Sequence, residues 1–402
     1  MNAPTSPDRY RRRASWPHPG VAVLACLGAL IALWPCSLPR SATISGVLTA
    51  GCVGLATVAG SWCTRGRPFR PAGAAAGVLA ATGAIVCIGV VSTAWQDALR
   101  ADVGAPRAGI GWWAVSTVPA IGLFCAIVLV PRATAVTFAA GAALLAGYLP
   151  AAHADKPAPH RAAPAAPVLY QPDDVDHLIG AHRLVTRWVR EGGLARGHVV
   201  IAVPTGSGWV DETAVTGFVH RFGGDVTVLA LQYAHQSSWR AFVGDRAAAG
   251  RSTTALLREV IAVRDRQRPE HRPAIHLYGQ SLGAVGADEA RAWAARHHPG
   301  AVGDTLLAGA PADTLGASMS GDHRTVLANR SDPVARWSIA LLWRLARLPA
   351  DTITTGRSTR RPPWLPLVGF VQTSVDLLTS LDGPPGIGHR YASYPMGPRA
   401  AS

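Results

Sequence analysis

Apolar residues fill most of the first 150 positions and then give way to a mixed sequence. From Gly20 to Leu149 the chain is dominated by Ala, Val, Leu, Ile and Gly, and charged residues are confined to short gaps. A helix needs about 20 apolar residues to cross the hydrocarbon core of a bilayer. The pattern predicts membrane-spanning helices at Gly20 to Leu38, Ala42 to Trp62, Ala72 to Trp95 and Gly109 to Val130, with a shorter, Ala-rich fifth run at Ala133 to Leu149.

Arginines beside these runs predict how the spans are oriented. If the amino terminus is cytoplasmic, eight arginines lie in the inside segments and three lie in the outside loops. Short cytoplasmic loops carry an excess of Lys and Arg, so the amino terminus is expected inside. Five crossings then carry the rest of the chain out of the cytoplasm, whereas four crossings leave it inside. We expect five.

The second half of the chain has the pattern of a parallel sheet covered by helices. From about His198, short runs rich in β-branched residues alternate with stretches of helical periodicity. This alternation predicts a doubly wound, mostly parallel α/β domain. The predicted strands are residues 198–204, 225–232, 274–278, 304–308 and 324–329, and the predicted helices are residues 212–222, 253–267 and 282–297.

These two patterns divide the 402 residues into a transmembrane domain at 1–150, a Pro- and Ala-rich linker at 151–168, and a catalytic domain at 169–402. The net charge of +14 does not indicate nucleic-acid binding, because the arginines of the first half flank apolar spans and those of the second are mixed with acids. All six cysteines lie in the apolar half without metal-ligand spacing. We therefore expect no metal and no cofactor.

The most informative motif is Gly279-Gln280-Ser281-Leu282-Gly283, which follows a predicted strand and opens a predicted helix. A G-x-S-x-G in this context is typical of a nucleophile elbow, a tight turn that holds a serine hydroxyl above the sheet. The alternative is that the two glycines only end the strand and begin the helix, with Ser281 as a helix N-cap. We predict that Ser281 is the nucleophile.

A serine nucleophile needs a base and an acid, which follow it along the chain in this fold. Asp332 comes directly after a predicted strand and before Pro333, at the sheet edge where such folds place their chemistry. Asp313 is the competing acid, because it also follows a predicted strand. His389 lies in a glycine-rich loop near the carboxyl terminus. We predict Asp332 as the acid and His389 as the base.

An oxyanion hole needs two N–H donors at the developing negative charge. The N–H of Leu282, next to the nucleophile, is one candidate. The other candidates are in the glycine-rich loop after the first predicted strand, where Gly206 and Ser207 precede Trp209, a further expected contact of the substrate. A glycine-rich loop of this kind can also cradle phosphate. Nucleotide-binding spacings are absent from the sequence here, which argues against that alternative.

Together these residues resemble bacterial membrane α/β-hydrolases that carry a multi-span amino-terminal domain. This resemblance implies the same triad, Ser281, Asp332 and His389, and names no substrate. The blocks that carry it are Thr205 to Val210, Gln232-Tyr233 with Ser238-Trp239 and Phe242, Gly279 to Gly283, Ser331 to Pro333, and Gly388-His389 with Tyr391.

The function predicted from the sequence is hydrolysis of a carboxylic ester through an acyl-enzyme on Ser281. A chain anchored in a bilayer favours a lipid or cell-envelope ester, so the expected partners are the bilayer and that substrate. The expected location is the bacterial cell membrane, with the catalytic domain outside the cytoplasm. Two alternatives remain open: acyl transfer by the same triad, and a non-catalytic membrane scaffold with a hydrolase-like fold.

Overall fold

The computed structural model describes residues 18–65, 71–129, 168–172, 176–234, 245–318, 323–357 and 360–391. Its chain divides into two compact units. A helical unit comprises residues 1–153 together with 362–372, and an α/β unit comprises residues 154–361 and 373–402. The fifth apolar run, most of the linker, and the block from Ser238 to Phe242 lie outside the described residues.

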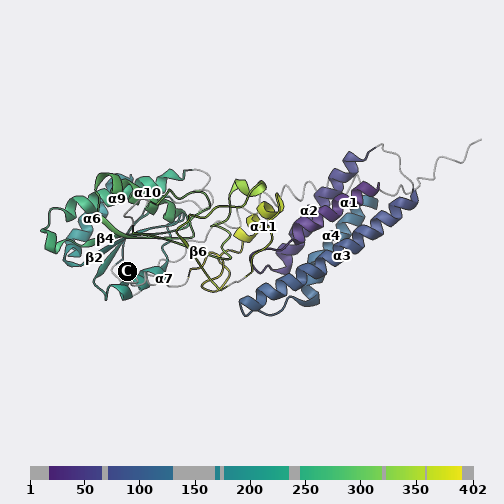
Figure 1. The fold of residues 1–402 in the computed structure, drawn as a ribbon, viewed down its shortest axis with the longest axis horizontal. Coiled ribbons are helices and arrows are strands. Elements are labelled where there is room, and N and C mark those ends of the chain that lie inside the picture. The colour runs from purple at the N-terminus through teal and green to yellow at the C-terminus, as the bar shows by residue number, and fades with distance from the viewer. Residues whose placement is uncertain are drawn as a thin grey trace, which may run out of the picture. The chain divides into compact units, whose positions relative to one another are not determined.

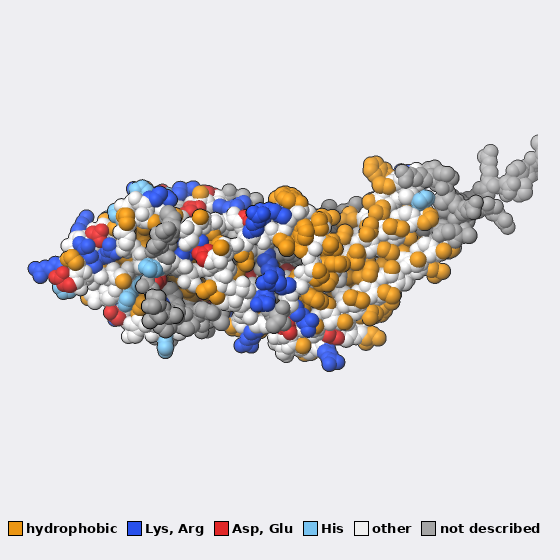
Figure 2. Space-filling model, in the orientation of Figure 1, with side chains coloured by type: hydrophobic (Ala, Val, Ile, Leu, Met, Phe, Trp, Pro, Cys, Tyr) orange, Lys and Arg blue, Asp and Glu red, His pale blue; other side chains and the backbone are white. Residues whose placement is uncertain are grey.

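The described part of the helical unit contains four helices, and three of them are long and apolar enough to cross a membrane. The first is shorter than predicted: it stops at Leu33 because Trp34 precedes a proline, which disfavours helical backbone. Figure 2 shows apolar side chains covering the visible face of this unit. The helices are α1 (Pro19–Leu33), α2 (Ala42–Cys63), α3 (Pro71–Asp102) and α4 (Gly109–Leu129).

Small residues let these helices approach closely. A Cβ atom added to Gly28 of α1 would lie 2.5 Å from the carbonyl oxygen of Cys52 in α2. One added to Gly46 of α2 would lie 2.4 Å from the carbonyl oxygen of Val115 in α4. Van der Waals packing between small residues is a main source of helix association in lipid.

Residues 362–372 belong to the helical unit although they are distant from it in sequence. The Gln372 side-chain amide donates to the carbonyl oxygens of Ile31 at 2.5 Å and Ala32 at 3.1 Å, near the end of α1. Buried Arg40 donates from its guanidinium to the carbonyl oxygen of Gln372 at 2.8 Å. The last carbonyls of a helix have no partner within it, so these contacts supply one.

Among the described residues, the α/β unit is built on a seven-stranded sheet in which every pair of neighbours is parallel, in the order β1-β3-β2-β4-β5-β6-β7. This confirms the predicted fold class. The strands are β1 (Val168–Gln171), β2 (His198–Val203), β3 (Val226–Leu231), β4 (Ala274–Gln280), β5 (Val302–Ala308), β6 (His323–Asn329) and β7 (Thr352–Thr355).

Helices cover both faces of the sheet (Figure 1). On one face, Trp188 of α6, Leu257 of α9 and Ala287 of α10 are buried in one apolar core. On the other, Val215 and Phe218 of α7 form a second core with the strands. These helices are α6 (His177–Arg190), α7 (Glu212–Arg221), α9 (Ala247–Arg264) and α10 (Leu282–His297), and α11 (Val368–Leu377) follows β7.

Four of the described strands and α-helices after residue 167 were not predicted: β1, α6, β7 and α11. The strands β1 and β7 have four residues each and lie at the two ends of the sheet, so their sequences carry little alternation. The remaining strands and helices occupy the predicted positions, with ends that differ by a few residues.

A cluster of two histidines lies at the amino ends of β2 and β4, the sheet edge opposite the nucleophile motif. His198 Nδ1 lies 3.1 Å from His276 Nε2, and the Phe222 ring stacks on both imidazoles. Asp304, which pairs with Arg221 at 3.1 Å, lies 3.8 Å from His276 Nδ1. Burial lowers the pKa of His198 and lowers the pKa of His276 to about 4.

We expect this cluster to make folding stability depend on pH. Because the folded-state pKa of His276 lies below the ordinary value of about 6.5, its contribution is complete above pH 6.5 and is lost as the pH falls toward 4. The loss for this one group is about 2 kcal/mol between pH 7 and pH 4.5. Thermal unfolding of the full-length protein in detergent should show a smaller decline on acidification for His276→Gln. An equal decline in both proteins would contradict the assignment.

Candidate active site

The predicted nucleophile lies in a strained turn between β4 and α10. Ser281 has φ 57° and ψ −126°, a backbone conformation that is unfavourable for a residue with a side chain. Its N–H donates to the carbonyl oxygen of Ala308 at 3.0 Å, which ties the turn to the end of β5. Ser281 occupies the N-cap position of α10, yet its side chain makes no capping hydrogen bond. The turn therefore holds the hydroxyl away from the helix backbone.

The two glycines of the motif are required by close backbone approaches. A Cβ atom on Gly279 would lie 2.1 Å from the carbonyl oxygen of Gly283, and one on Gly283 would lie 2.3 Å from the carbonyl oxygen of Val203. Real Cβ contacts are never this short, so neither position accepts a side chain without displacing the backbone. The second contact also places the end of β2 directly beside the start of α10.

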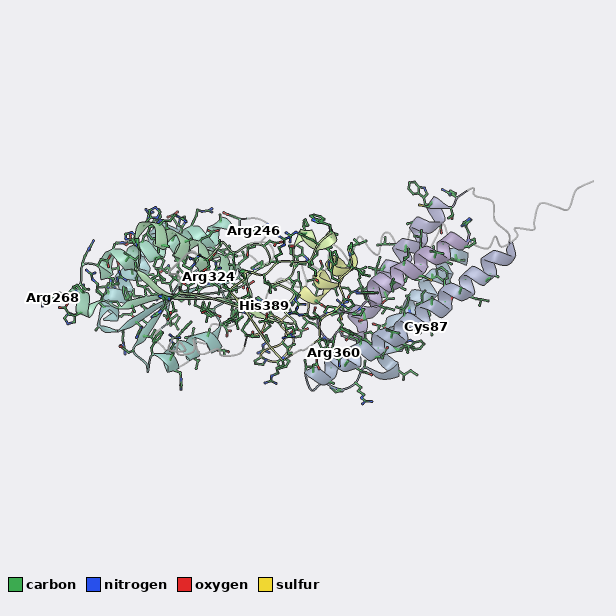
Figure 3. The ribbon with its side chains drawn as sticks, in the orientation of Figure 1. Cys87, Arg246, Arg268, Arg324, Arg360 and His389 are labelled. Carbon is green, nitrogen blue, oxygen red and sulfur yellow. The ribbon has the colours of Figure 1, made fainter. Side chains whose placement is uncertain are left out.

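Asp332 and His389 are brought together although 57 residues separate them. His389 Nδ1 lies 2.9 Å from Asp332 Oδ2, and both side chains are buried. A proton on Nδ1 that is donated to this carboxylate leaves Nε2 as an acceptor. Among the described residues, the buried His389 Nε2 has no hydrogen-bond partner. Figure 3 labels His389 in the α/β unit.

Asp332 has no exposed surface and is held by three donors. Besides His389, the Tyr391 hydroxyl donates to Oδ2 at 2.6 Å and the Val334 N–H donates to Oδ1 at 2.8 Å. The Tyr391 hydroxyl in turn accepts a hydrogen bond from the Asn329 N–H at 3.1 Å. Burial and the nearby Asp332 charge raise the pKa of Tyr391 well above its usual range, so it stays a donor.

Hydrogen bonds hold the loop that carries His389 next to the nucleophile turn. The Gln280 side-chain amide donates to the carbonyl oxygen of His389 at 3.0 Å, and Gln280 directly precedes Ser281. The His389 N–H donates to the carbonyl oxygen of Ser380 at 2.7 Å. Asn329 donates from its side chain to the carbonyl oxygens on both sides of His389, each at 3.0 Å. The histidine backbone is therefore fixed from three separate segments.

The glycine-rich loop after β2 is ordered by its own backbone and by β1. The Thr205 N–H donates to the carbonyl oxygen of Trp209 at 2.9 Å, and the Gly208 N–H donates to that of Thr205 at 2.8 Å. The Tyr170 hydroxyl lies 3.0 Å from the carbonyl oxygen of Gly208 and 2.8 Å from Gln232 Oε1. Because β2 ends beside α10, this loop, which includes Gly206 and Ser207, starts beside the buried Leu282.

Comparison with known proteins places this architecture in a family. Residues 174–325 and 314–398, together more than half of the chain, match the alpha/beta-hydrolase family. The chain belongs to the alpha/beta-hydrolase family. No curated protein matches this α/β-hydrolase.

Solved structures resemble the α/β-hydrolase at low identity. The RedJ thioesterase of prodiginine biosynthesis in Streptomyces coelicolor is 16% identical, with 55% of this chain and 94% of that chain covered and a TM-score of 0.25. RedJ with a bound polyethylene glycol is 18% identical over 35% and 72% of the two chains, with a TM-score of 0.23. An acetylxylan esterase is 16% identical over 40% and 81%, with a TM-score of 0.22.

Asp313, the competing acid, lies in the α/β unit but away from His389. Its carboxylate pairs with the Arg344 guanidinium at 3.0 Å, and no described contact joins it to His389. Asp313 also borders a cavity of about 620 Å³ that runs along β6. Ser281, Asp332 and His389 do not line this cavity, so it is distinct from the candidate active site.

Sequence reasoning missed three contributors to the site: Gly309, Gln280 and Asn329. Gly309 has φ 57°, and a Cβ atom there would lie 2.6 Å from His389 Cε1 and 2.8 Å from Asp332 Oδ2. The glycine after β5 thus makes room for the imidazole. Its sequence signal is a Gly-Ala-Pro directly after a strand, which indicated only a turn.

Proposed function

We propose that this α/β-hydrolase is a membrane-anchored serine hydrolase that cleaves a carboxylic ester through an acyl-enzyme on Ser281. The observation that supports this most directly is the buried His389–Asp332 hydrogen bond, which leaves the imidazole Nε2 without a partner beside the nucleophile turn. A serine hydroxyl becomes an effective nucleophile when such a base removes its proton.

In the proposed reaction, Ser281 Oγ attacks the ester carbonyl carbon while His389 Nε2 takes the hydroxyl proton. Asp332 holds the imidazole through Nδ1 and stabilises its positive charge. The N–H groups of Leu282 and of Gly206 or Ser207 bind the oxyanion. The imidazolium then protonates the leaving alcohol, and water, deprotonated by His389, releases the acid and regenerates the serine.

Covalent labelling with a fluorophosphonate tests the proposal. Such a probe reacts with a serine that is activated by a base, so the full-length protein in detergent should be labelled, and peptide mass spectrometry should locate the label on Ser281. Heat-denatured protein provides the background. A folded protein that resists labelling would favour the non-catalytic scaffold, and labelling on another serine would contradict the assigned nucleophile.

The helical unit favours the proposal that the substrate is a component of the membrane or cell envelope. Three helices are long and apolar enough to cross a bilayer, so the catalytic unit is tethered near lipid esters at high effective concentration. Acyl transfer to an alcohol acceptor uses the same residues and differs only in the nucleophile of the second step. Release of free acid when no alcohol acceptor is added would distinguish hydrolysis from acyl transfer.

We expect the catalytic unit to lie outside the cytoplasm of a bacterial cell, because the arginine distribution predicts that the amino terminus is inside. Five spans then carry the chain out, and this count includes the 15-residue α1 and the fifth apolar run, which lies outside the described residues. Fusions after Ser402 measure this. Alkaline phosphatase should be active in that position, and green fluorescent protein should stay dark. Bright fluorescence without phosphatase activity would indicate an even number of crossings and a substrate on the inner leaflet.

Tyr391→Phe is expected to lower kcat by about tenfold, since a hydrogen bond to a charged group is worth roughly 1.5–3 kcal/mol. The hydroxyl is 2.6 Å from Asp332 Oδ2 and orients the carboxylate rather than contacting the ester, so KM should change little. In an Asp332→Asn background the same substitution should cost no further turnover, because the two groups act as a unit. Additive losses in the double variant would indicate a merely structural role.

A further inference from the structure

The segment from Ile339 to Leu348 exposes large apolar side chains on the α/β unit. Ile339 is 62% exposed, Trp343 is 61% exposed and Leu345 is 60% exposed. Leu348 is 38% exposed and borders the 620 Å³ cavity. Single exposed apolar residues are common, but several together in one short segment mark an interaction surface.

This segment is held in its exposed position by the fold. Ala340 and Leu341 are buried and fix its first turn, whose hydrogen bonds include one from the Arg344 N–H to the carbonyl oxygen of Ala340 at 2.7 Å. The Arg344 guanidinium pairs with Asp313 at 3.0 Å and joins the segment to the loop after β5. Because the backbone is already ordered, binding through Trp343 and its neighbours costs little conformational entropy.

The charge of the segment from Ile339 to Leu348 favours an anionic partner. Residues 334–350 contain three arginines and no acidic residue, and one of the three, Arg336, is turned into the unit and donates to the carbonyl oxygen of Arg330. Arg344 is balanced by Asp313, whereas Arg347 is exposed and forms no ion pair with any described residue. Trp and Leu beside Arg form the composition that inserts at the boundary between headgroups and acyl chains and attracts anionic lipids. Three helices of the same chain are long and apolar enough to cross a membrane, so the chain would be tethered to a bilayer.

The segment is also connected to the candidate active site within the α/β unit. The Trp337 indole, just before the segment, donates to the Ser374 hydroxyl of α11 at 2.8 Å. Six residues after Ser374, the carbonyl oxygen of Ser380 accepts the His389 N–H. The segment and the histidine loop are therefore both attached to the stretch from Ser374 to Ser380.

We propose that residues 339–348 dock on an anionic lipid surface, with Trp343 and Leu345 inserted below the headgroups. This proposal deepens the proposed function by naming the surface from which the ester substrate is taken. Only its predicted effect on ester turnover rests on the proposed function. Insertion itself is independent of catalysis.

The location test uses the full-length protein reconstituted in vesicles, with an environment-sensitive fluorescent amino acid at position 345. Position 178 is the matched control, since Leu178 is 58% exposed on α6. Lipids with brominated acyl chains should quench the reporter at 345 and not at 178, more strongly when about 30 mol% phosphatidylglycerol is present. Equal quenching at the two positions overturns the proposal. Shielding of position 345 that persists in detergent and grows with protein concentration also overturns it, by indicating a second copy of the chain.

The kinetic test uses a double variant that carries both Trp343→Ser and Leu345→Ser. The control is a second double variant that carries Leu178→Ser and Ile179→Ser. Turnover of an ester embedded in anionic vesicles should fall about tenfold in the first double variant, whereas a short soluble ester should be cleaved at the wild-type rate. Equal loss on both substrates overturns the docking role. Absence of soluble-ester turnover in the wild type contradicts the proposed hydrolase, and the quenching result then stands by itself.

Discussion

Ser281→Ala is expected to abolish ester turnover, with a loss in kcat of about 10⁶-fold, the scale seen when a triad nucleophile is removed. The substitution deletes one hydroxyl that makes no capping hydrogen bond, and alanine meets the same backbone strain at φ 57° as serine does. The folded structure should therefore persist. Initial rates on a short chromogenic ester, together with thermal unfolding, measure the two effects separately.

Two further variants make this result interpretable. Ser252→Ala removes a buried hydroxyl on α9 that has no hydrogen-bond partner among the described residues, and it should retain normal turnover. His389→Ala should be as inactive as Ser281→Ala, and the double variant should be no worse, because base and nucleophile act together. Normal rates in Ser281→Ala would rule out the mechanism, and full activity in His389→Ala would require another base.

Asp332→Asn is expected to lower kcat by roughly 10⁴-fold, because the amide no longer holds the histidine in the required tautomer. The carboxylate has no exposed surface, and its Oδ2 accepts from His389 Nδ1 and Tyr391 Oη. An amide NH₂ in place of Oδ2 would face the donors of His389 and Tyr391, with which it cannot form a hydrogen bond. The pH–rate profile and kcat on the same soluble ester measure the loss.

Asp313→Asn is the matched control for this prediction, since Asp313 also follows a strand of the sheet. Its carboxylate pairs with Arg344 and is 30% exposed, so its replacement should change turnover by less than about threefold. If Asp313→Asn were the more damaging of the two, the acid would have to be reassigned to Asp313.

Much of the architecture could be predicted because it depends on local pattern. Apolar runs of about 20 residues predict helices long enough to cross a membrane, and β-branched runs between helical stretches predict a parallel sheet. The motif around Ser281 could be placed for the same reason, since strand, turn and helix are adjacent in the chain. Helix α10 begins at Leu282 and ends at His297, as predicted.

The two four-residue strands could not be predicted, because tertiary contacts create them. Strand β1 has four residues and exists through its pairing with β3, so the predicted linker ran into it. The first predicted span extends to Leu38, but helix α1 ends at Leu33. The apolar pattern continues past Pro35, whereas the helix stops before it. The docking of Gln372 on the carbonyl oxygens of α1 joins residues 340 positions apart.

The sequence by itself determined the two-part organisation, the parallel α/β fold and the chemical types of the candidate site residues, because these follow from periodicity and from spacing within one turn. Only the tertiary structure decided which carboxylate meets the imidazole. Asp332 and Asp313 both follow strands, yet only Asp332 lies 2.9 Å from His389. That choice depends on Gly309, whose missing side chain leaves room for the ring, and on loop contacts across 109 residues from Gln280. Such long-range contacts leave no periodic signal in the chain.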